Sequence, residues 1–248
     1  MNIGAVYVLW LRDVKRFIRA RSRLAGSLGM PLFFLVFLGF GFRSARFPGV
    51  DIDYMEFLIP GIIAMVLLFS STFSGISIIW DRQFGFLREI MVTPVSRTSI
   101  VTGRMLGGTT TSLIQGMVIL LLGGVKGMQI EGMIFAIPLM ILISLGFVGM
   151  GIAFASVMED THGFQLVMNF VVFPIFFLSG SLYPVEILPS ILKHAALINP
   201  LTYGVDALRN VLTGFHTFPL YLDIFVCIMF VFFTLLLSSF LFNRAEVG

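Results

Sequence analysis

The sequence is short of charged residues and contains a single cysteine. Asp, Glu, Lys and Arg make up 12% of its 248 residues, whereas soluble globular chains contain roughly 25%. The one cysteine, Cys227, excludes a disulfide within the chain and a metal cluster built from several cysteines. The chain also lacks the phosphate-binding motif G-x-x-x-x-G-K-[ST], the nucleophile motif G-x-S-x-G and the zinc motif H-E-x-x-H. A catalytic role for this chain is therefore not expected.

Apolar residues dominate what is present. Hydrophobic side chains make up 58% of the chain, including 28 Phe and 14 Met, and the mean hydropathy is +1.01. A helix needs about 20 mostly apolar residues to cross a bilayer. We therefore expect an all-α integral membrane protein that forms one domain over residues 1–248. Its six predicted spans cover residues 24–42, 57–80, 105–125, 133–157, 164–183 and 221–242.

The first apolar stretch has a second interpretation, because it follows a basic segment as the apolar part of a signal peptide does. The basic segment is long for a signal peptide, and the apolar run extends over about 19 residues, close to the length of a membrane span. An uncleaved first span is therefore favoured.

The positions of Lys and Arg predict how the chain is oriented. Most of them lie in residues 1–23, in the 81–104 loop and in the C-terminal tail. Cytoplasmic loops of membrane proteins carry an excess of Lys and Arg. We therefore place both termini and the 81–104 loop in the cytoplasm, and residues 184–220 outside the cell membrane. The basic residues flank apolar runs and do not alternate with exposed aromatic residues, so nucleic-acid binding is not expected.

Residues 1–23 are expected to form an amphipathic helix in the cytoplasmic membrane interface. At about 100° per residue, basic side chains share one face and apolar side chains share the other. Tyr7 and Trp10 suit the level of the lipid headgroups, and anionic lipids would hold the basic face. A topology signal with no further role is the alternative. The basic face contains Arg12, Lys15, Arg16, Arg19 and Arg23, and the apolar face contains Ile3, Val6, Tyr7, Trp10, Leu11, Val14, Phe17 and Ile18.

The external segment is too apolar for an ordinary loop. Asn199 fits the N-cap of a second short helix, with Pro200 at its first position and Gly214 just after its end. Each of the two helices would have about 12 residues and extend about 18 Å, which is less than the bilayer thickness. We therefore expect a re-entrant pair of helices that enters the membrane from outside. Asp206 and Arg209, three residues apart, are expected to form a local ion pair.

The connection between the second and third predicted spans is expected to contain a short amphipathic helix over residues 84–93. Pro94 follows it and interrupts the helix there. This helix either lies on the membrane surface or is gripped by a soluble partner that moves the attached spans. Its apolar half contains Phe84, Phe86, Leu87, Ile90 and Met91, and its other half contains Gly85, Arg88, Glu89, Val92 and Thr93.

The apolar centres of the predicted spans contain no Asp, Glu, Lys or Arg. Ion-coupled carriers usually hold such residues within the membrane, so a self-powered carrier is disfavoured. Gln115, Gln165 and Asn169 are milder polar groups that either contact a substrate or join helices, and the G-x-x-x-G pattern at Gly103–Gly107 allows close helix contact. The stretch MEDTHG, residues 158–163, is interpreted as a solvated turn, with a metal site as the less favoured alternative.

Two regions resemble those of a known family. The stretch DRQFGFLREIMVTPVSRTSIVTGRMLGG, residues 81–108, is similar to the cytoplasmic loop of type-2 ABC export permeases, and in particular to the drug-resistance branch that includes daunorubicin-type exporters. The stretches FPIFFLSGSLYPVEILP and INPLTYGVDALRNVLTG, within residues 173–214, are similar to the family's fifth-span exit and external helices. With the six-span layout, the resemblance extends over nearly the whole chain.

The resemblance implies partners and roles that composition cannot supply. Such permeases pair as two six-span halves, either identical or closely related, and each half binds a separate ATPase subunit that holds ATP and Mg. The coupling helix that docks on the ATPase would comprise Phe84, Gly85, Phe86, Leu87, Arg88, Glu89, Ile90, Met91, Thr93 and Pro94. The interfacial helix would act through Trp10, Arg12, Lys15, Arg16 and Arg19. The external gate would comprise Tyr183, Pro184, Asn199, Pro200, Leu201, Tyr203, Asp206 and Arg209.

The leading hypothesis is therefore the membrane subunit of an ATP-driven exporter, with no cofactor of its own. Its substrate would be a hydrophobic or amphiphilic compound such as a drug, a lipid or a lipid-linked glycan. A self-contained secondary transporter and a membrane enzyme are the competing hypotheses. The transporter hypothesis is disfavoured because the centres of the predicted spans contain no charged residue. The enzyme hypothesis is disfavoured because the chain offers no pair of residues that would act as nucleophile and base.

The distribution of Lys and Arg leads to a testable topology. Cysteines introduced separately at Ser190 and Ser96 should react with a membrane-impermeant thiol reagent from opposite sides of the membrane. The measurement is labelling of intact cells and of inverted vesicles. Labelling of both positions from outside would show that the predicted orientation is wrong.

Overall fold

The structure is a computed structural model that describes residues 2–43, 52–85, 95–125 and 130–244, and within those ranges it contains helices and no strand. The long α-helices are α1 (Ile3–Arg19), α2 (Arg21–Gly41), α3 (Tyr54–Ser74), α6 (Arg97–Val125), α7 (Ile130–Val157) and α12 (Leu220–Arg244). The shorter α-helices are α4 (Ile76–Gln83), α8 (Thr161–Val167), α9 (Phe173–Leu178), α10 (Ser190–Ile198) and α11 (Pro200–Thr213). A π-helix, η1 (Met168–Val172), joins α8 to α9, and a 3-10 turn, η2 (Val185–Ile187), precedes α10.

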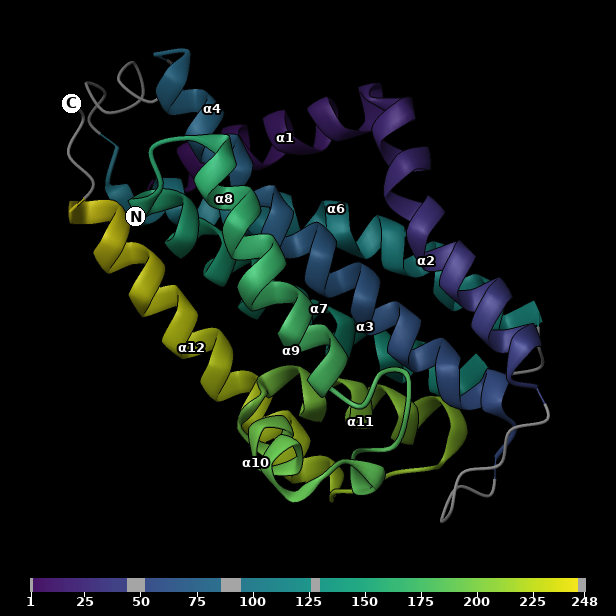
Figure 1. Ribbon diagram of the computed structural model, residues 1–248. Coiled ribbons are helices and arrows are strands. Elements are labelled where there is room, and N and C mark those ends of the chain that lie inside the picture. Colours follow the sequence, from purple (N-terminus) through teal and green to yellow (C-terminus); the bar gives the residue numbers. More distant parts are fainter. Residues whose placement is uncertain (1, 44–51, 86–94, 126–129, 245–248) are drawn as a thin grey trace.

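The helices form a bundle with two distinct ends (Figure 1). Helices α3, α6 and α7 pass through the middle, with α2 on one side and α12 on the other. Helix α1 lies across one end, close to α4, and we call this the α1 end. Helices α10 and α11 lie at the opposite end, which we call the α11 end. The core is centred on α3, whose residues from Phe57 to Leu68 are nearly all inaccessible to solvent.

Five helical segments among the described residues are long and apolar enough to cross a membrane. They correspond to the second to sixth predicted spans and cover Tyr54–Gln83, Arg97–Gly124, Ile130–Val157, Thr161–Leu178 and Leu220–Phe242. The first predicted span corresponds to α2, in which the described apolar part is the shorter Gly26–Gly41. The structure thus supports a multi-pass membrane protein, and the sixth crossing stays a prediction.

Several predicted boundaries need correction. The third spanning helix begins at Arg97 rather than at residue 105, because Arg104 is paired with acidic side chains and does not have to face lipid. The two short helices of the predicted re-entrant pair have 9 and 14 residues rather than about 12 each. Asn199 caps α11 as expected: its side-chain oxygen accepts a hydrogen bond from the Leu201 amide at 3.0 Å. Gly214 ends the helix with a φ of 77°, the left-handed conformation that favours glycine.

Glycines bring α3 and α7 into backbone contact. A Cβ atom on Gly151 would collide with the backbone of Thr72, and one on Gly75 would collide with the backbone of Gly151. Within lipid there is little hydrophobic force between helices, so close van der Waals packing between small residues provides much of the association. The centre of the bundle therefore depends on the absence of side chains at these positions.

The fifth predicted span is interrupted where Pro174 enters it. Pro174 has no backbone N–H, and the helix widens into η1 directly before it. The amide of Phe173 donates to the carbonyl of Met168, five residues earlier, in place of the usual four. The widened turn thus keeps its backbone groups hydrogen-bonded without the proline's missing donor.

The glycine contact between α3 and α7 predicts different effects of the same substitution at two helical sites. Gly151→Ala should destabilise the protein by roughly 1–3 kcal/mol, because the new methyl group overlaps the α3 backbone. Gly29→Ala is the matched control: a Cβ there meets nothing within 4 Å, and alanine favours a helix by up to about 1 kcal/mol. Thermal unfolding in detergent measures both. Equal melting temperatures for the two variants would contradict the packing argument.

Candidate functional site

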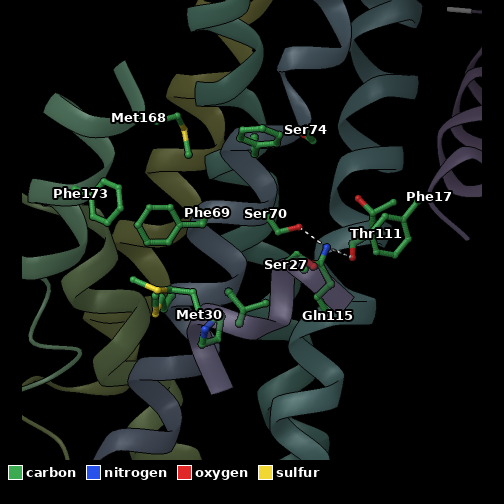
Figure 2. Close-up of a pocket in the computed structure, with 15 residues that line it drawn as sticks. Phe17, Ser27, Met30, Phe69, Ser70, Ser74, Thr111, Gln115, Met168 and Phe173 are labelled. Atoms are coloured by element: carbon green, nitrogen blue, oxygen red, sulfur yellow. Dashed lines mark hydrogen bonds between the residues drawn. The ribbon is translucent and has the colours of Figure 1, made fainter. Parts of the chain in front are cut away.

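A cavity lies between α2 and the η1–α9 segment, against α3, α6 and the end of α1 (Figure 2). Its volume is about 510 Å³, within the range of small-molecule sites. Aromatic and sulfur-containing side chains form much of its wall, and the close-up shows Phe69 and Phe173 next to each other on one side of it, with ring centroids 4.9 Å apart. The walls come from α1, α2, α3, α6 and the η1–α9 segment: Phe17, Gly26, Ser27, Met30, Pro31, Met65, Val66, Phe69, Ser70, Phe73, Ser74, Thr111, Gln115, Met168 and Phe173.

One side of this cavity is polar. The Gln115 amide nitrogen donates to the Ser70 hydroxyl at 2.6 Å and to the Thr111 carbonyl at 3.1 Å (Figure 2). Both donor hydrogens are therefore in use, and the amide orientation is fixed. The Gln115 side-chain oxygen is buried and has no hydrogen-bond partner among the described residues. An unpaired buried acceptor thus lies beside the polar side of the cavity.

The π-helix shapes the opposite side of the cavity. Met168 and Phe173, the first residue of η1 and the residue directly after it, both line the wall. Single π-turns occur often at functional sites, because they re-aim side chains relative to a regular α-helix. The proline that widens this turn thus also determines which side chains face the cavity.

A cluster of charged side chains lies at the α1 end. Asp81 lies near the end of α4. Its carboxylate forms ion pairs with Arg104 of α6 and with Arg12 of α1, the latter at 2.7 Å. Asp13 accepts from Arg12 at 3.2 Å and lies 3.8 Å from Arg104. The Arg104 side chain is only 3% exposed and also donates to Ser77 at 3.1 Å. Partial burial lowers the pKa of Arg12, but Asp81 and Asp13 more than offset this and raise it, so Arg12 remains charged.

The charged cluster joins the two helices that flank residues 86–94. Helix α4 leads into that segment and α6 leads out of it, and Asp81 and Arg104 connect the two. Arg82, next to Asp81, donates to the carbonyls of Ser156 at 3.1 Å and Met158 at 3.0 Å. These carbonyls lie at the C-terminal end of α7, which a positive charge stabilises. This end of α4 is therefore connected by polar contacts to α1, α6 and α7.

Helix α1 is amphipathic, but it ends at Arg19 rather than at residue 23, because a new helix, α2, begins at Arg21. Its contacts also differ from the prediction. Arg12 points into the charged cluster, and Arg16 lies over the Trp80 ring at 5.1 Å, so these two do not only face lipid headgroups. The Trp10 indole donates to Thr110 of α6 at 3.0 Å. Lys15 and Arg19 are exposed, as predicted. The difference arises because α1 packs along α6 and buries Val6, Leu9 and Phe17.

The G-x-x-x-G pattern explains how α1 approaches α6. Gly103 faces Leu9 and the backbone of Val6, and a Cβ on Gly107 would come 2.9 Å from the Cβ of Asp13. Side chains larger than hydrogen would push α1 away and separate Asp13 from Arg104. This pattern therefore serves the charged cluster.

Most of the predicted coupling helix lies outside the described residues. The predicted helix over 84–93 does not begin at Phe84, because Phe84 and Gly85 form the turn that ends α4, where Gly85 adopts a φ of 77°. Phe84 is 83% exposed. The remaining predicted residues are Phe86, Leu87, Arg88, Glu89, Ile90, Met91, Thr93 and Pro94, and they all fall in the undescribed range 86–94. Their predicted role stays a prediction.

The predicted gate residues gather at the α11 end. The Asn199 amide donates to the Ile175 carbonyl of α9 at 2.7 Å, and Leu201, next to Pro200, is fully buried. Tyr203 donates to the Leu197 carbonyl at 2.8 Å, so it ties α11 to α10. Tyr183 precedes Pro184, and its hydroxyl donates to the Phe177 carbonyl at 2.6 Å.

The predicted ion pair between Asp206 and Arg209 is wrong, since the two groups turn to different partners. The Asp206 carboxylate accepts hydrogen bonds from the Thr217 amide at 2.9 and 3.0 Å and from the Phe218 amide at 2.8 Å. Arg209 donates to the Gly180 carbonyl at 2.9 Å and stacks on the Phe57 ring at 3.7 Å. Burial raises the pKa of Asp206, and the two amides act in the opposite direction. Each group is thus used to hold a loop against α11.

Sequence reasoning missed four charged residues that the structure places at key positions. These are Asp13, Asp81, Arg104 and Asp223, to which the sequence analysis assigned no role. The signal available was the depth of Arg104 in a helical stretch beside the small residues of GRMLGG.

Asp160, in the MEDTHG turn, accepts from the Gly163 amide at 2.7 Å and caps α8.

Together the fold and site define a multi-pass helical membrane protein with a cavity and with a charged cluster at one end. The chain belongs to the ABC-2 type transporter family, which matches residues 4–213. The predicted family is therefore confirmed, whereas its drug-resistance branch stays a prediction.

Three relatives are similar to most of the chain, and two of them are named transport permeases. The chain is 31% identical over 207 residues to a putative transport permease, ycf38, of Cyanophora paradoxa, covering 79% of this chain and 71% of the relative. It is 28% identical to Nodulation protein J of Rhizobium leguminosarum bv. trifolii, covering 84% of this chain and 78% of the relative. It is 25% identical to the inner membrane transport permease YadH of Escherichia coli K12, covering 92% and 90%.

The charged cluster predicts that Asp81 stabilises the fold. Asp81→Asn removes the anion shared by Arg12 and Arg104 and leaves the buried Arg104 with only the more distant Asp13. We expect a loss of about 3–5 kcal/mol, the usual effect of breaking a buried ion pair from one side. Glu159→Gln is the control, since Glu159 is exposed and surface changes stay within about 0.5 kcal/mol. Thermal unfolding in detergent compares the two, and similar losses would refute the role of the cluster.

Proposed function

We propose that the chain is the membrane subunit of an ATP-driven exporter and works with a separate ATPase subunit. The observation that carries the proposal is the charged cluster at the α1 end. It links both helices that flank residues 86–94 to the interfacial helix α1. Membership of the ABC-2 type transporter family supports the same function. ATP and Mg would bind to the partner subunit.

In this proposal the α1 end faces the cytoplasm, as the distribution of Lys and Arg predicts. The ATPase grips residues 84–94 as a coupling helix, and Phe84, whose side chain is 83% exposed, offers it an apolar contact. Movement of this segment pulls on Asp81 and Arg104, which hold α4, α6 and α1 together. The ATPase can thus move several helices through one contact.

The cavity is the part of the path that would receive the substrate. Its apolar walls and single polar side suit an amphiphile that carries a hydrogen-bond donor, such as a drug, a lipid or a lipid-linked glycan. Ser70 and Thr111 hold the Gln115 amide so that its free oxygen accepts that donor. The substrate is thus recognised mainly by shape and apolar surface, with one polar contact.

A second permease subunit, identical or closely related, would complete the path. Exposed aromatic residues on α2 and on the η1–α9 segment, including Phe33, Phe37, Phe170 and Phe177, offer apolar surface for it or for lipid. Helices α10 and α11 would close the outer exit. In support, α11 lies beside the first third of α7, where Gly132 approaches the backbone of Val211. Such a position suits a helix that re-enters the membrane from outside.

The proposal is tested by ATP-driven transport in a reconstituted complex. Burying one large aliphatic side chain contributes roughly 1.5–3 kcal/mol. Ile90→Asp removes that contribution and introduces a charge, so ATPase affinity should fall roughly 100-fold or more. Glu89→Ala, on the opposite half of the helix, should weaken assembly less. Co-purification of the ATPase subunit and ATP-dependent uptake of a fluorescent amphiphile into inverted vesicles are measured together.

A variant of the cavity separates substrate binding from ATPase docking. Ser27 lines the cavity from α2, and Ser27→Trp fills part of the space. This variant should retain the ATPase and lose uptake, whereas Ile90→Asp should lose both. Normal ATPase binding and uptake in Ile90→Asp would show that residues 84–94 only lie on the membrane surface. ATP-independent uptake would favour the secondary transporter.

A further inference from the structure

Asp223 is a buried carboxylate for which the proposed function gives no role. It lies in the first turn of α12, and its side chain is 0% exposed. Neither of its carboxylate oxygens has a hydrogen-bond partner among the described residues. By contrast, only 17% of the apolar stretch of α12 is buried. Asp223 is therefore on the one face of this helix that packs into the bundle.

The position of Asp223 along the bundle is well inside the α11 end. Helices α7 and α12 run side by side in the same direction, since Gly146 faces Phe230 and Gly149 faces Thr234. Gly204 of α11 contacts both Ile143 and Cys227, which places those two residues at one level. Asp223 precedes Cys227 by one turn, so it lies about 13 Å further in than the start of α7.

Among the described residues, no charged or titratable group forms an ion pair or hydrogen bond with Asp223. From α11, Asp206 is held by two loop amides, Arg209 is held by Gly180 and Phe57, and Tyr203 donates to Leu197. On α12 itself, Tyr221 is exposed and Cys227 is one turn away. From α7 the titratable group at this end is Glu131, which is exposed. Helix α6 also packs against α12, and its Arg97 and Arg104 lie toward the α1 end. His216, in the loop between α11 and α12, is also exposed.

A carboxylate that is buried inside the bundle without a hydrogen-bond or ion-pair partner does not remain charged. An ionised carboxyl group without a partner in an apolar environment is so unfavourable that it takes up a proton instead. Ionisable residues within a membrane bundle are therefore functional-site candidates by default. Asp206 and Asp223 differ in this respect, because Asp206 accepts hydrogen bonds from two backbone N–H groups, which stabilise its charged form. Two neighbouring carboxyl groups with opposed environments separate into a charged and a neutral member.

We propose that Asp223 is a proton-binding site, which keeps its proton while α11 covers the start of α12. Release of the proton converts the carboxylic acid into a carboxylate. Water must then reach Asp223, to take up the proton and to solvate the carboxylate. Water reaches this position only if α11 separates from α12. Proton binding at Asp223 is thus linked to the contact between the two helices, and a proton stabilises the state in which that contact is closed. The inference does not depend on the substrate or on the ATPase partner.

Infrared spectroscopy of the purified protein in lipid nanodiscs tests the proton directly. At neutral pH the wild-type spectrum should contain the C=O stretching band of a protonated carboxylic acid, which shifts in heavy water. Asp223→Asn should lack the band, and Glu131→Gln should retain it. Asp223→Glu, which keeps the carboxyl group, should retain it at a shifted frequency. Absence of the band from wild type, or its persistence in Asp223→Asn, would overturn the proposal.

Thermal unfolding over a range of pH provides a second readout. The folded wild type holds a proton that an unfolded aspartate has lost above about pH 4. Its unfolding equilibrium constant should therefore rise about tenfold per pH unit relative to Asp223→Asn, up to the pH at which Asp223 ionises. Parallel pH curves would refute proton binding. A stabilisation by sodium that Asp223→Asn abolishes, with no protonated band, would replace the proton by a metal cation and overturn the proposal.

Discussion

Lipid offers no hydrogen bonds to a polypeptide, and the arrangement of this bundle follows from that constraint. Each backbone group within the membrane needs a partner in the chain itself, so long helices dominate and irregular turns occur only where neighbours supply the missing bonds. The widened turn before Pro174 is one such place, because the Phe173 amide finds the Met168 carbonyl. The Gly180 carbonyl is another, because Arg209 reaches it from α11. Polar side chains in this protein therefore serve backbone groups as often as they serve each other.

The same constraint governs the charges. Arg104 lies within a spanning helix and is tolerated because Asp81 and Asp13 surround it. Isolated, each of these groups would destabilise the bundle; together they place α1, α4 and α6 in a fixed relation. An ion-pair cluster of this kind contributes geometry more than net stability, since desolvation offsets much of the attraction. Apolar contacts alone would allow these helices to shift relative to one another, whereas the ion pairs fix their relative positions.

The overall architecture was accessible from sequence because it rests on local patterns. Apolar run lengths located the spanning helices, the 3.6-residue period revealed α1, and Asn199, Pro200 and Gly214 marked the ends of α11. Contacts between distant segments were not accessible in this way. The partners of Asp206 lie 11 and 12 residues away in a loop, and the local rule for residues three apart pointed to Arg209 instead. The site followed the same division: Gln115 was identified as a polar residue within a span, but only the fold brings Ser70 and the η1–α9 segment to it.

The π-turn at Met168–Val172 also changes how the helix around it is to be interpreted. A π-turn accommodates one residue more than a turn of α-helix, so the side chains beyond it are rotated by about 100° relative to a continuous helix. A single helical wheel drawn through Thr161–Leu178 therefore assigns the residues after the turn to the wrong faces. The helical phase of α9 is therefore independent of that of α8, so each helix can evolve separately which of its faces points toward the cavity and which toward lipid. One inserted or deleted residue at this turn would reset that phase without breaking the helix on either side.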